Sequence, residues 1–273
     1  MKFAFFFPGQ GSQSVGMMQG FGDESVIKQT FVEASDILGQ DFWQMATEPN
    51  ELLNQTANTQ PLMLAAGVAT WRVWQARGGK QPSIMAGHSL GEYTALVAAG
   101  VLSYKDALPL VRYRAEVMQS AVAEGVGAMA AILGLDDDIV RSVCAEAAQG
   151  EVLEAVNLNS PGQVVIAGHK TAVDRGMELA KAKGAKRALP LPVSVPSHCA
   201  LMKPAAEKLA SYIAEVNMVA GNVDVLHNAD VAAYAKTDKI KDALVRQLYS
   251  PVRWVETVQQ IHAQGVGSAA DCG

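Results

Sequence analysis

The segment GHSLG at residues 87–91 matches the G-x-S-x-G pattern of a nucleophile elbow. In that pattern a serine occupies a strained turn between a strand and a helix, and the two glycines leave space where a Cβ atom would clash. The context agrees, because the short apolar run 83–86 precedes the motif and an alanine-rich helical stretch begins near Leu90. So short a pattern also occurs by chance in loops, but the strand-turn-helix context favours a nucleophilic Ser89.

A nucleophilic serine requires a base that takes its proton, and the chain offers five histidines. His198 is the strongest candidate, because prolines precede it, restrict the backbone and can aim the ring into a cleft. His88 adjoins the serine, but we expect its side chain to point to the other side of the turn and to be structural. His169 follows the end of a predicted strand in the small domain. His227 and His262 have no special surroundings, and we interpret them as satisfied or exposed imidazoles.

An acid that orients the base is harder to place. The α/β-hydrolase order of serine, acid and histidine makes residues 136–138 and Asp174 formal candidates. These aspartates stand at the beginning of predicted helices, where capping of the helix N-terminus explains them better. We therefore expect an uncharged acceptor, such as a backbone carbonyl, to orient His198, which makes the site a dyad rather than a triad.

A glycine-rich turn, PGQGSQ at residues 8–13, follows the first predicted strand. Ser14 occupies the place of the third glycine of a dinucleotide-binding fingerprint, and no Gly-Lys-Ser/Thr follows, so neither nucleotide-binding motif is satisfied. The turn fits an oxyanion hole better. We expect its two donors to be the N–H groups of Leu90 and Gln10.

Arg114 is the most informative charged residue. In the predicted helix 103–123 it shares the buried stripe of Val111, Ala115 and Met118. A buried arginine requires a partner, and two interpretations are open. One is an ion pair with a carboxylate of the protein itself, and the other is bidentate binding of a substrate carboxylate by the planar guanidinium.

Strands and helices alternate along the chain, which predicts a layered α/β fold with a parallel sheet. From residue 125 the expected order changes to β-α-β-β-α-β, the split unit of ferredoxin-like folds. We therefore predict a hydrolase-like large domain, 1–124 and 194–273, with an inserted ferredoxin-like small domain, 125–193, and the site in the cleft between them. Strands are expected at 2–7, 83–86, 128–133, 154–157, 164–167 and 187–193, and helices at 26–38, 61–75, from 90 onward, at 103–123, after 136–138 and at 172–183.

Composition limits the function classes. Of the 273 residues 49% are hydrophobic and 18% are charged, which is typical of a folded globular chain. The net charge of −5 argues against a nucleic-acid partner, and no apolar stretch is long enough to be a secretory signal or to span a membrane. The three scattered cysteines, Cys144, Cys199 and Cys272, predict reduced thiols rather than disulfides or a metal site. We expect a cytoplasmic protein.

Taken together, these residues resemble the malonyl-CoA:acyl carrier protein transacylases of type II fatty acid synthesis, and nearly the whole chain takes part in the resemblance. The matching landmarks are FPGQGSQ at 7–13, TQP at 59–61, GHSLGE at 87–92, Arg114 with MQ at 118–119, NSPGQ at 159–163, PSH at 196–198 and QLY at 247–249.

The resemblance implies a set of roles. Malonyl-CoA would acylate Ser89, His198 would act as general base and then general acid, and Gln247 would supply the acceptor that orients His198. Arg114 would hold the malonyl carboxylate. The implied substrate-binding residues are Arg114, Gln10, Leu90, Gln60, Met118, Asn159 and Ser197, the last at a position that varies with acyl preference in this family.

The implied reaction is ping-pong transfer to the phosphopantetheine thiol of acyl carrier protein, with malonyl-CoA as a substrate and without cofactor or metal. The carrier is expected to be acidic and this chain is net negative, so docking requires a local positive region. Our candidate is the basic cluster Lys181, Lys183, Lys186 and Arg187.

Three alternatives stay open at this point: an acyltransferase of a polyketide pathway, a serine esterase or thioesterase, and an acyl-binding protein without turnover. An esterase shares the elbow and the base but does not need Arg114. Members of the family usually continue past a Gly-Pro-Gly turn into a last strand and helix, whereas this sequence stops at Gly273. The resemblance therefore implies that the last strand and helix contribute to stability and full activity.

Overall fold

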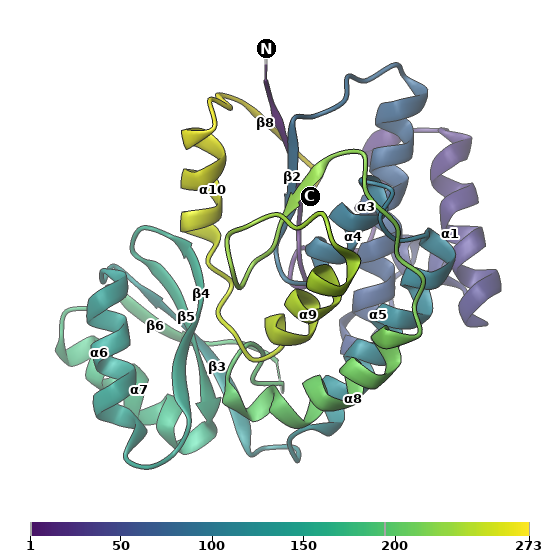
Figure 1. The fold of residues 1–273 in the computed structure, drawn as a ribbon. Coiled ribbons are helices and arrows are strands. Elements are labelled where there is room, and N and C mark those ends of the chain that lie inside the picture. Colours follow the sequence, from purple (N-terminus) through teal and green to yellow (C-terminus); the bar gives the residue numbers. More distant parts are fainter. Residues whose placement is uncertain (1, 194, 273) are drawn as a thin grey trace.

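The computed structural model describes residues 2–193 and 195–272 and contains two four-stranded sheets (Figure 1). The first sheet is parallel, as the alternation of strands and helices predicts, with the order β7-β2-β1-β8. Its strands are β1 (Ala4–Phe7), β2 (Ile84–Gly87), β7 (Asp224–Leu226) and β8 (Ala269–Asp271). Buried on both faces, β1 and β2 are nearly continuous apolar runs.

Helices cover both faces of the parallel sheet. On one face Phe5 and Phe7 belong to the main core, where the Phe5 ring meets Trp71 edge-on at 5.1 Å. On the other face Phe6 packs against Trp254. The helices of this part are α1 (Ser25–Leu38), α2 (Phe42–Thr47), α3 (Thr56–Ala76), α4 (Leu90–Ala98), α5 (Tyr104–Ser120), α8 (Lys203–Ala214), α9 (Thr237–Gln247) and α10 (Trp254–Ala263), with short 3-10 turns at Gln19–Phe21, Leu52–Asn54 and Ala200–Met202.

The second sheet is antiparallel and has the strand order β4-β5-β3-β6. The chain segment that forms this sheet confirms the predicted ferredoxin-like succession. Its elements are, in chain order, β3 (Gly127–Leu133), α6 (Asp137–Ala148), β4 (Leu153–Ser160), β5 (Gln163–His169), α7 (Lys170–Ala182) and β6 (Arg187–Pro190). Its helices pack on one face, around Ile132 and Ile166, and its other face carries Met129 and Val165. The predicted domain boundaries stay a prediction, and the residues 1, 194 and 273 at their limits lie outside the described residues.

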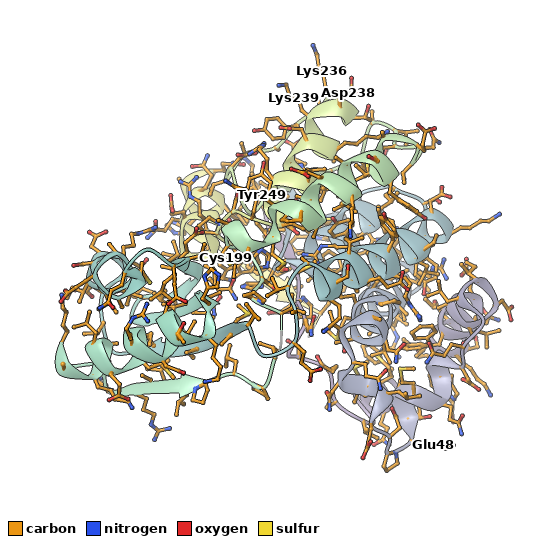
Figure 2. The ribbon with its side chains drawn as sticks, turned by 90° about the horizontal axis from the view of Figure 1, so that it is seen from below. Glu48, Cys199, Lys236, Asp238, Lys239 and Tyr249 are labelled. Carbon is orange, nitrogen blue, oxygen red and sulfur yellow. The ribbon has the colours of Figure 1, made fainter. Side chains whose placement is uncertain are left out.

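The small sheet is joined along β4 to the segment between α9 and α10. The N–H of Leu158 donates to the carbonyl of Val252 at 3.0 Å, and the N–H of Val252 donates to the carbonyl of Val156 at 2.8 Å. Cys199 and Tyr249 lie between the two parts of the molecule in Figure 2. The small sheet is thus hydrogen-bonded directly to the segment that follows α9.

Several element bounds differ from the sequence prediction: β4 is longer than the expected 154–157, α5 ends at Ser120 instead of residue 123, and two further differences involve prolines. The helix expected from Pro61 begins five residues earlier, at Thr56, so the proline lies inside α3 rather than at its first position. β6 ends at Pro190 instead of continuing to residue 193, because two prolines follow each other closely there and withdraw N–H donors from the ladder. Within residues 2–193 and 195–272, no helix has both the length and the apolar character that a membrane span requires.

Ser89 occupies the sharp turn between β2 and α4, with φ 51° and ψ −107°. This conformation is unfavourable for a residue with a side chain and marks a strained elbow. A Cβ atom on Gly87 would lie 1.9 Å from the carbonyl group of Gly91, and one on Gly91 would lie 2.2 Å from the carbonyl oxygen of Phe7. The two glycines therefore have the steric role that the motif predicts.

Gly87→Ala should disrupt this turn. Its Cβ would collide with backbone, which cannot move aside as a flexible side chain can, so we expect the free energy of unfolding to fall by more than about 2 kcal/mol. Urea unfolding measures this change. The control is Gly20→Ala, where a Cβ atom would meet no atom within 4 Å. Equal stability of the two variants would contradict this role of Gly87.

Candidate active site

A small pocket of about 110 Å³ lies between the two sheets, with Ser89 in its wall. It is lined by both parts of the chain: Gln10, Thr56, Gln60, His88, Ser89, Leu90, Arg114 and Met118 precede the small sheet, Met129 and Asn157 belong to it, and Leu191, Val193, Val195, Ser197 and His198 follow it. The predicted location between a large and a small sheet therefore matches the observed pocket.

Ser89 and His198 form a hydrogen-bonded pair, with 2.8 Å between Oγ and Nε2. The other ring nitrogen, Nδ1, lies 2.8 Å from the backbone carbonyl of Gln247. A carbonyl only accepts, so Nδ1 carries the proton and Nε2 is free to accept from the serine. His198 has φ 67°, and its own N–H donates to the carbonyl of Leu248. The expected neutral acceptor is present, and the arrangement is a dyad.

The His198 imidazole is kept neutral by its surroundings. Burial is the main cause, and the positive guanidinium of Arg114 adds to it, so that the pKa of His198 falls from 6.5 to about 3. The hydrogen bond to the Gln247 carbonyl raises the pKa of His198, but by less than burial and Arg114 lower it. The ring is therefore in the form that accepts a proton from Ser89.

Arg114 is fully buried, with 1% of its surface exposed, and reaches the serine from α5. Its Nη1 donates to Gln60 Oε1 at 2.7 Å, and its Nη2 donates to Gln247 Oε1 at 2.9 Å and to Ser89 Oγ at 3.1 Å. The ion pairs among residues 2–193 and 195–272 do not include Arg114. The alternative of an internal ion pair is thus wrong for the described residues.

The expected oxyanion donors both lie on the pocket wall. The hydrogen bonds found within the described part of the chain leave the backbone N–H groups of Gln10 and Leu90 without an acceptor. Leu90 is the first residue of α4, so its N–H also lies at the positive end of the helix dipole. Ser89 N–H, in contrast, is occupied by Asn228 Oδ1 at 2.7 Å.

The remaining predicted binding residues divide into two groups. Gln60, Met118 and Ser197 line the pocket, and Gln60 Nε2 contacts Met118 Sδ at 3.8 Å. Asn159 does not line the pocket, and its Oδ1 lies 2.8 Å from His88 Nε2. Asn157 of the same strand lines the pocket instead. The prediction that Asn159 binds substrate directly therefore has no support from its position.

His88 is structural, as expected, but its residue also lines the pocket. Its ring packs against Trp254, with 5.7 Å between ring centroids, and burial lowers the pKa of the imidazole. Its Nε2 contact with Asn159 completes this packing. His88 therefore connects the elbow to α10 and to β4.

Sequence reasoning missed a buried polar network behind the pocket, and His227 is a clear correction. Instead of lacking special surroundings, His227 is 1% exposed and its Nδ1 lies 2.7 Å from Glu92 Oε1. Glu92 also accepts from the N–H of Asn228 and from Gln247 Nε2. Asn228 Nδ2 in turn donates to the carbonyl of Gly87. Only Glu92 gave a sequence signal, as a carboxylate in the otherwise apolar face of the helix after the elbow.

The described aspartates of the small part of the chain form no contact with His198, although the capping expected of them is only partly met. Asp136 occupies the N-cap position of α6 without a side-chain hydrogen bond to it, and Asp174 lies within α7, where it pairs with Lys170 on the surface. Cys199 is buried with its Sγ 3.1 Å from the carbonyl of Pro196, and burial raises the pKa of its thiol to about 12. It is a structural thiol, as expected.

Comparison with known proteins gives a consistent result. The family described as "Acyl transferase domain" matches residues 4–271. The "Malonyl CoA-acyl carrier protein transacylase" of Escherichia coli K12 is 57% identical over 274 residues, covering 100% of this chain and 89% of the relative, and that of Bacillus subtilis is 43% identical over 275 residues, covering 100% and 86%.

Two solved structures are similar over 100% of this chain and 89% of theirs. One is an acyl-carrier-protein S-malonyltransferase from Burkholderia pseudomallei, at 60% identity and a TM-score of 0.98. The other is a type II polyketide acyl-carrier protein in complex with its malonyl-transacylase, at 55% identity and a TM-score of 0.98.

The depressed pKa of His198 predicts an unusual pH dependence of Ser89 reactivity. An imidazole with pKa 6.5 would be largely protonated at pH 5 and would slow labelling of Ser89 roughly thirtyfold relative to pH 8. We expect little loss over this range, because the neutral form persists until the pH approaches the lowered pKa of about 3. The rate is measured by labelling Ser89 with phenylmethanesulfonyl fluoride, because this reagent carries no carboxylate that could pair with Arg114.

Arg114→Met is the informative companion variant in that measurement. Removing the guanidinium takes away the second cause of the lowered pKa, so the loss of labelling should move to higher pH. A thirtyfold loss in the unmodified chain, or an unchanged profile in Arg114→Met, would contradict the assignment.

Proposed function

The chain belongs to the acyl transferase domain family, and from this we propose that it transfers a malonyl group from malonyl-CoA to the phosphopantetheine thiol of acyl carrier protein. The observation that carries the proposal is Arg114, a buried guanidinium without a carboxylate of the described chain, 3.1 Å from the Ser89 hydroxyl. Relatives named for this reaction are 56 and 57% identical over the whole chain.

The first half-reaction acylates Ser89. As Oγ attacks the thioester carbonyl of malonyl-CoA, its proton passes to His198 Nε2, 2.8 Å away. The carbonyl oxygen becomes negative and accepts hydrogen bonds from the N–H groups of Gln10 and Leu90. The C–S bond then breaks, and the CoA sulfur leaves with the proton that His198 returns. The product is a malonyl ester of Ser89.

The second half-reaction reverses these steps with a different thiol. His198 takes the proton of the phosphopantetheine thiol, and the sulfur attacks the ester carbonyl. The same two N–H groups hold the oxyanion, and Ser89 Oγ leaves with the proton from His198. The Gln247 carbonyl holds Nδ1–H throughout, so the ring keeps one orientation in both directions. These steps use side chains and backbone alone, without cofactor or metal.

Arg114 gives the site its preference for an acyl group that ends in a carboxylate. Both residues that accept from its Nη atoms besides Ser89 are glutamines, and no carboxylate of the described residues forms an ion pair with the fork, so an incoming carboxylate can fill that place. Burying a guanidinium among neutral groups is costly, and an esterase of neutral substrates would gain nothing from it. This observation favours the transferase over the esterase and the thioesterase.

The substrate carboxylate also increases the basicity of His198. Arg114 is the second cause of the lowered His198 pKa, after burial. Once malonyl pairs with the guanidinium, the positive charge next to the ring is neutralised and the pKa of His198 rises toward its ordinary value. The correct substrate thus improves the base that acts on it, whereas an acetyl group does not.

For the carrier, we propose the acyl carrier protein of fatty acid biosynthesis in the cytoplasm. A polyketide carrier is the second candidate, because a similar structure at 55% identity is of a malonyl-transacylase bound to a type II polyketide carrier. The three free cysteines fit a reducing compartment.

For the docking surface, we propose the basic cluster at the start of β6. Lys181 and Lys183 are already paired with Glu178 and Glu146, whereas the ion pairs within the described ranges leave Lys186 and Arg187 unused. From Arg187 the chain runs along β6 to Leu191 in the pocket wall, about 13 Å away at the rise of a strand. An acidic carrier on this cluster would lie close to the pocket entrance.

Arg114→Met should abolish the preference for malonyl. Incubated with equal malonyl-CoA and acetyl-CoA, the unmodified chain should form a malonyl adduct on Ser89, and the variant should lose about a hundredfold in the ratio of malonyl to acetyl rates, because a bidentate charged contact is gone. Intact-protein mass spectrometry measures both adducts. Arg112→Met, on the same helix but bonded to Gln40, is the control. An unchanged ratio in Arg114→Met would refute the carboxylate contact.

Reversing the charge of Lys186 and Arg187 to glutamate should raise the KM for the carrier roughly tenfold, with acylation by malonyl-CoA unchanged. Steady-state transfer at several carrier concentrations measures it. The control is the same reversal at Lys236 and Lys239, which lie at the N-terminal end of α9, far from the small sheet (Figure 2). Unchanged carrier kinetics would discard the cluster as the docking site.

A further inference from the structure

We propose that Glu92 is a positioning residue that fixes the orientation of the Gln247 side-chain amide and thereby keeps the Arg114 guanidinium aimed at the acyl group. This inference rests on the proposed function. Glu92 lies on α4, three residues after the nucleophile, and its side chain is fully buried. It does not line the pocket, so it acts on substrate only through other residues.

The Glu92 carboxylate is surrounded by donors. Its Oε2 accepts from the N–H of Asn228 at 2.8 Å and from Gln247 Nε2 at 2.9 Å, and its Oε1 lies 2.7 Å from His227 Nδ1. An ionised carboxylate accepts at both oxygens and donates at neither. Whatever group faces Oε2 must therefore present an N–H.

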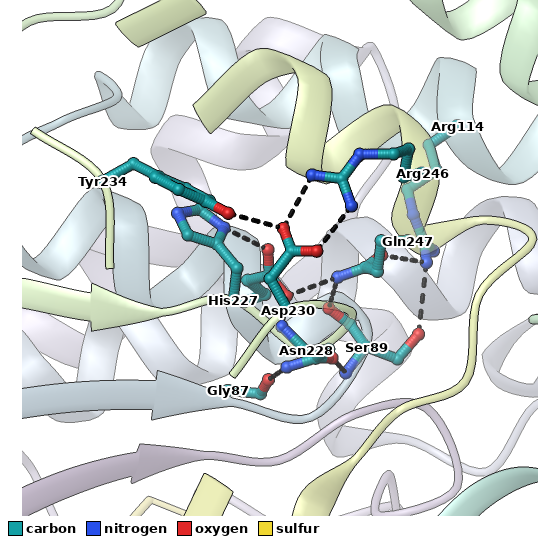
Figure 3. A network of polar contacts seen from close by, with 10 residues as sticks. Gly87, Ser89, Arg114, His227, Asn228, Asp230, Tyr234, Arg246 and Gln247 are labelled. Carbon is teal, nitrogen blue, oxygen red and sulfur yellow. Dashed lines mark hydrogen bonds and ion pairs between the residues drawn. The ribbon is translucent and has the colours of Figure 1, made fainter. Parts of the chain in front are cut away.

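This requirement selects one of the two orientations of the Gln247 amide. In the observed one Nε2 donates to Glu92 Oε2 and to the carbonyl of Ser89, while Oε1 accepts from Arg114 Nη2. Figure 3 shows Gln247 between Arg114 and the backbone of Ser89. Turned by 180°, the amide would set its oxygen against two acceptors and its N–H₂ against the guanidinium, with all three contacts repulsive.

The consequence concerns the charge of Arg114. Through Gln247 the guanidinium receives a neutral oxygen, while the negative charge of Glu92 stays one amide away from it. A carboxylate in direct contact would form a strong ion pair and occupy the fork that the substrate needs. The Gln247 amide therefore separates the buried charges of Glu92 and Arg114. Because Glu92 binds the N–H₂ of this amide, the amide oxygen faces the Arg114 guanidinium.

The groups around Glu92 support this position from further out. Among the described residues, His227 Nε2 has no hydrogen-bond partner, and the ring lies against Tyr234. Tyr234 donates to Asp230, which forms an ion pair with Arg246 (Figure 3). In the part of the chain that the structure describes, no hydrogen bond or ion pair joins Tyr234, Asp230 or Arg246 to the Gln247 side chain or to Arg114, so these residues offer controls in the same network.

Two substitutions of Glu92 separate positioning from general structure. In Glu92→Gln the new side-chain oxygen can still accept from Gln247, and its N–H₂ can face His227 Nδ1 if the ring changes tautomer, which costs no existing bond at Nε2. Glu92→Met has similar size and only a weakly accepting thioether, so it removes the charged contact among the three that hold the Gln247 amide in its observed orientation. Tyr234→Phe is the control for loss of a network bond elsewhere.

The readout is the ratio of Ser89 acylation rates from malonyl-CoA and acetyl-CoA, measured by mass spectrometry. We expect Glu92→Met to lower this ratio at least about tenfold, the effect of a lost charged hydrogen bond, and Glu92→Gln and Tyr234→Phe to stay within about threefold of the unmodified chain. The pH profile of labelling should not move, because His198 is held by the backbone carbonyl of Gln247.

Each outcome decides the proposal. An unchanged ratio in Glu92→Met, or an equal loss in Glu92→Gln, overturns it. If Glu92→Met fails to fold, Gln247→Met replaces it, since this variant keeps the backbone carbonyl and removes the amide, and a retained malonyl preference then overturns the proposal. A lack of malonyl preference in the unmodified chain would instead refute the proposed function, so the two failures are distinct.

Discussion

The structure depends on one electrostatic constraint: a guanidinium buried beside the nucleophile must be kept charged and oriented without a carboxylate in contact. Arg114 meets this constraint through the side-chain oxygens of Gln60 and Gln247. These neutral acceptors offset only part of the free-energy cost of removing the guanidinium from water. An anionic ligand can offset the rest, which favours its binding. The same charge lowers the pKa of His198, so the guanidinium influences both binding and the base.

The backbone contributes the other fixed elements. Ser89 and His198 both have positive φ, which places the two reacting side chains at strained points held by their neighbours. Ser89 N–H is anchored by Asn228, and His198 N–H by the carbonyl of Leu248. Because these anchors come from the segments around β7 and α9, the last third of the chain holds the site together although the nucleophile lies in the first third.

How far the sequence predicts this site follows from the range of the interactions involved. The elbow is a local steric pattern, so Gly87 and Gly91 were sufficient to place Ser89. Arg114 and His198 also gave signals, as a charge on an apolar stripe and as a histidine after prolines. His227 and Asn228 gave no signal, and the carboxylate of Glu92 on an apolar helix face did not reveal its partners, because these lie more than 130 residues away along the chain. Pro61 misled the prediction, since proline at a first helical position is common and α3 begins earlier.

The backbone hydrogen bonds between Val252 and β4 link the small sheet to the catalytic histidine. One short segment contains both the residues that hold His198 and the residue that binds the small sheet. The carbonyls of Gln247 and Leu248 accept from the His198 ring and backbone N–H, and Val252 is hydrogen-bonded to β4. A movement of the small sheet would therefore also displace the imidazole. The spacing between His198 and Ser89 is thus coupled to the placement of the small sheet, although neither residue belongs to that sheet.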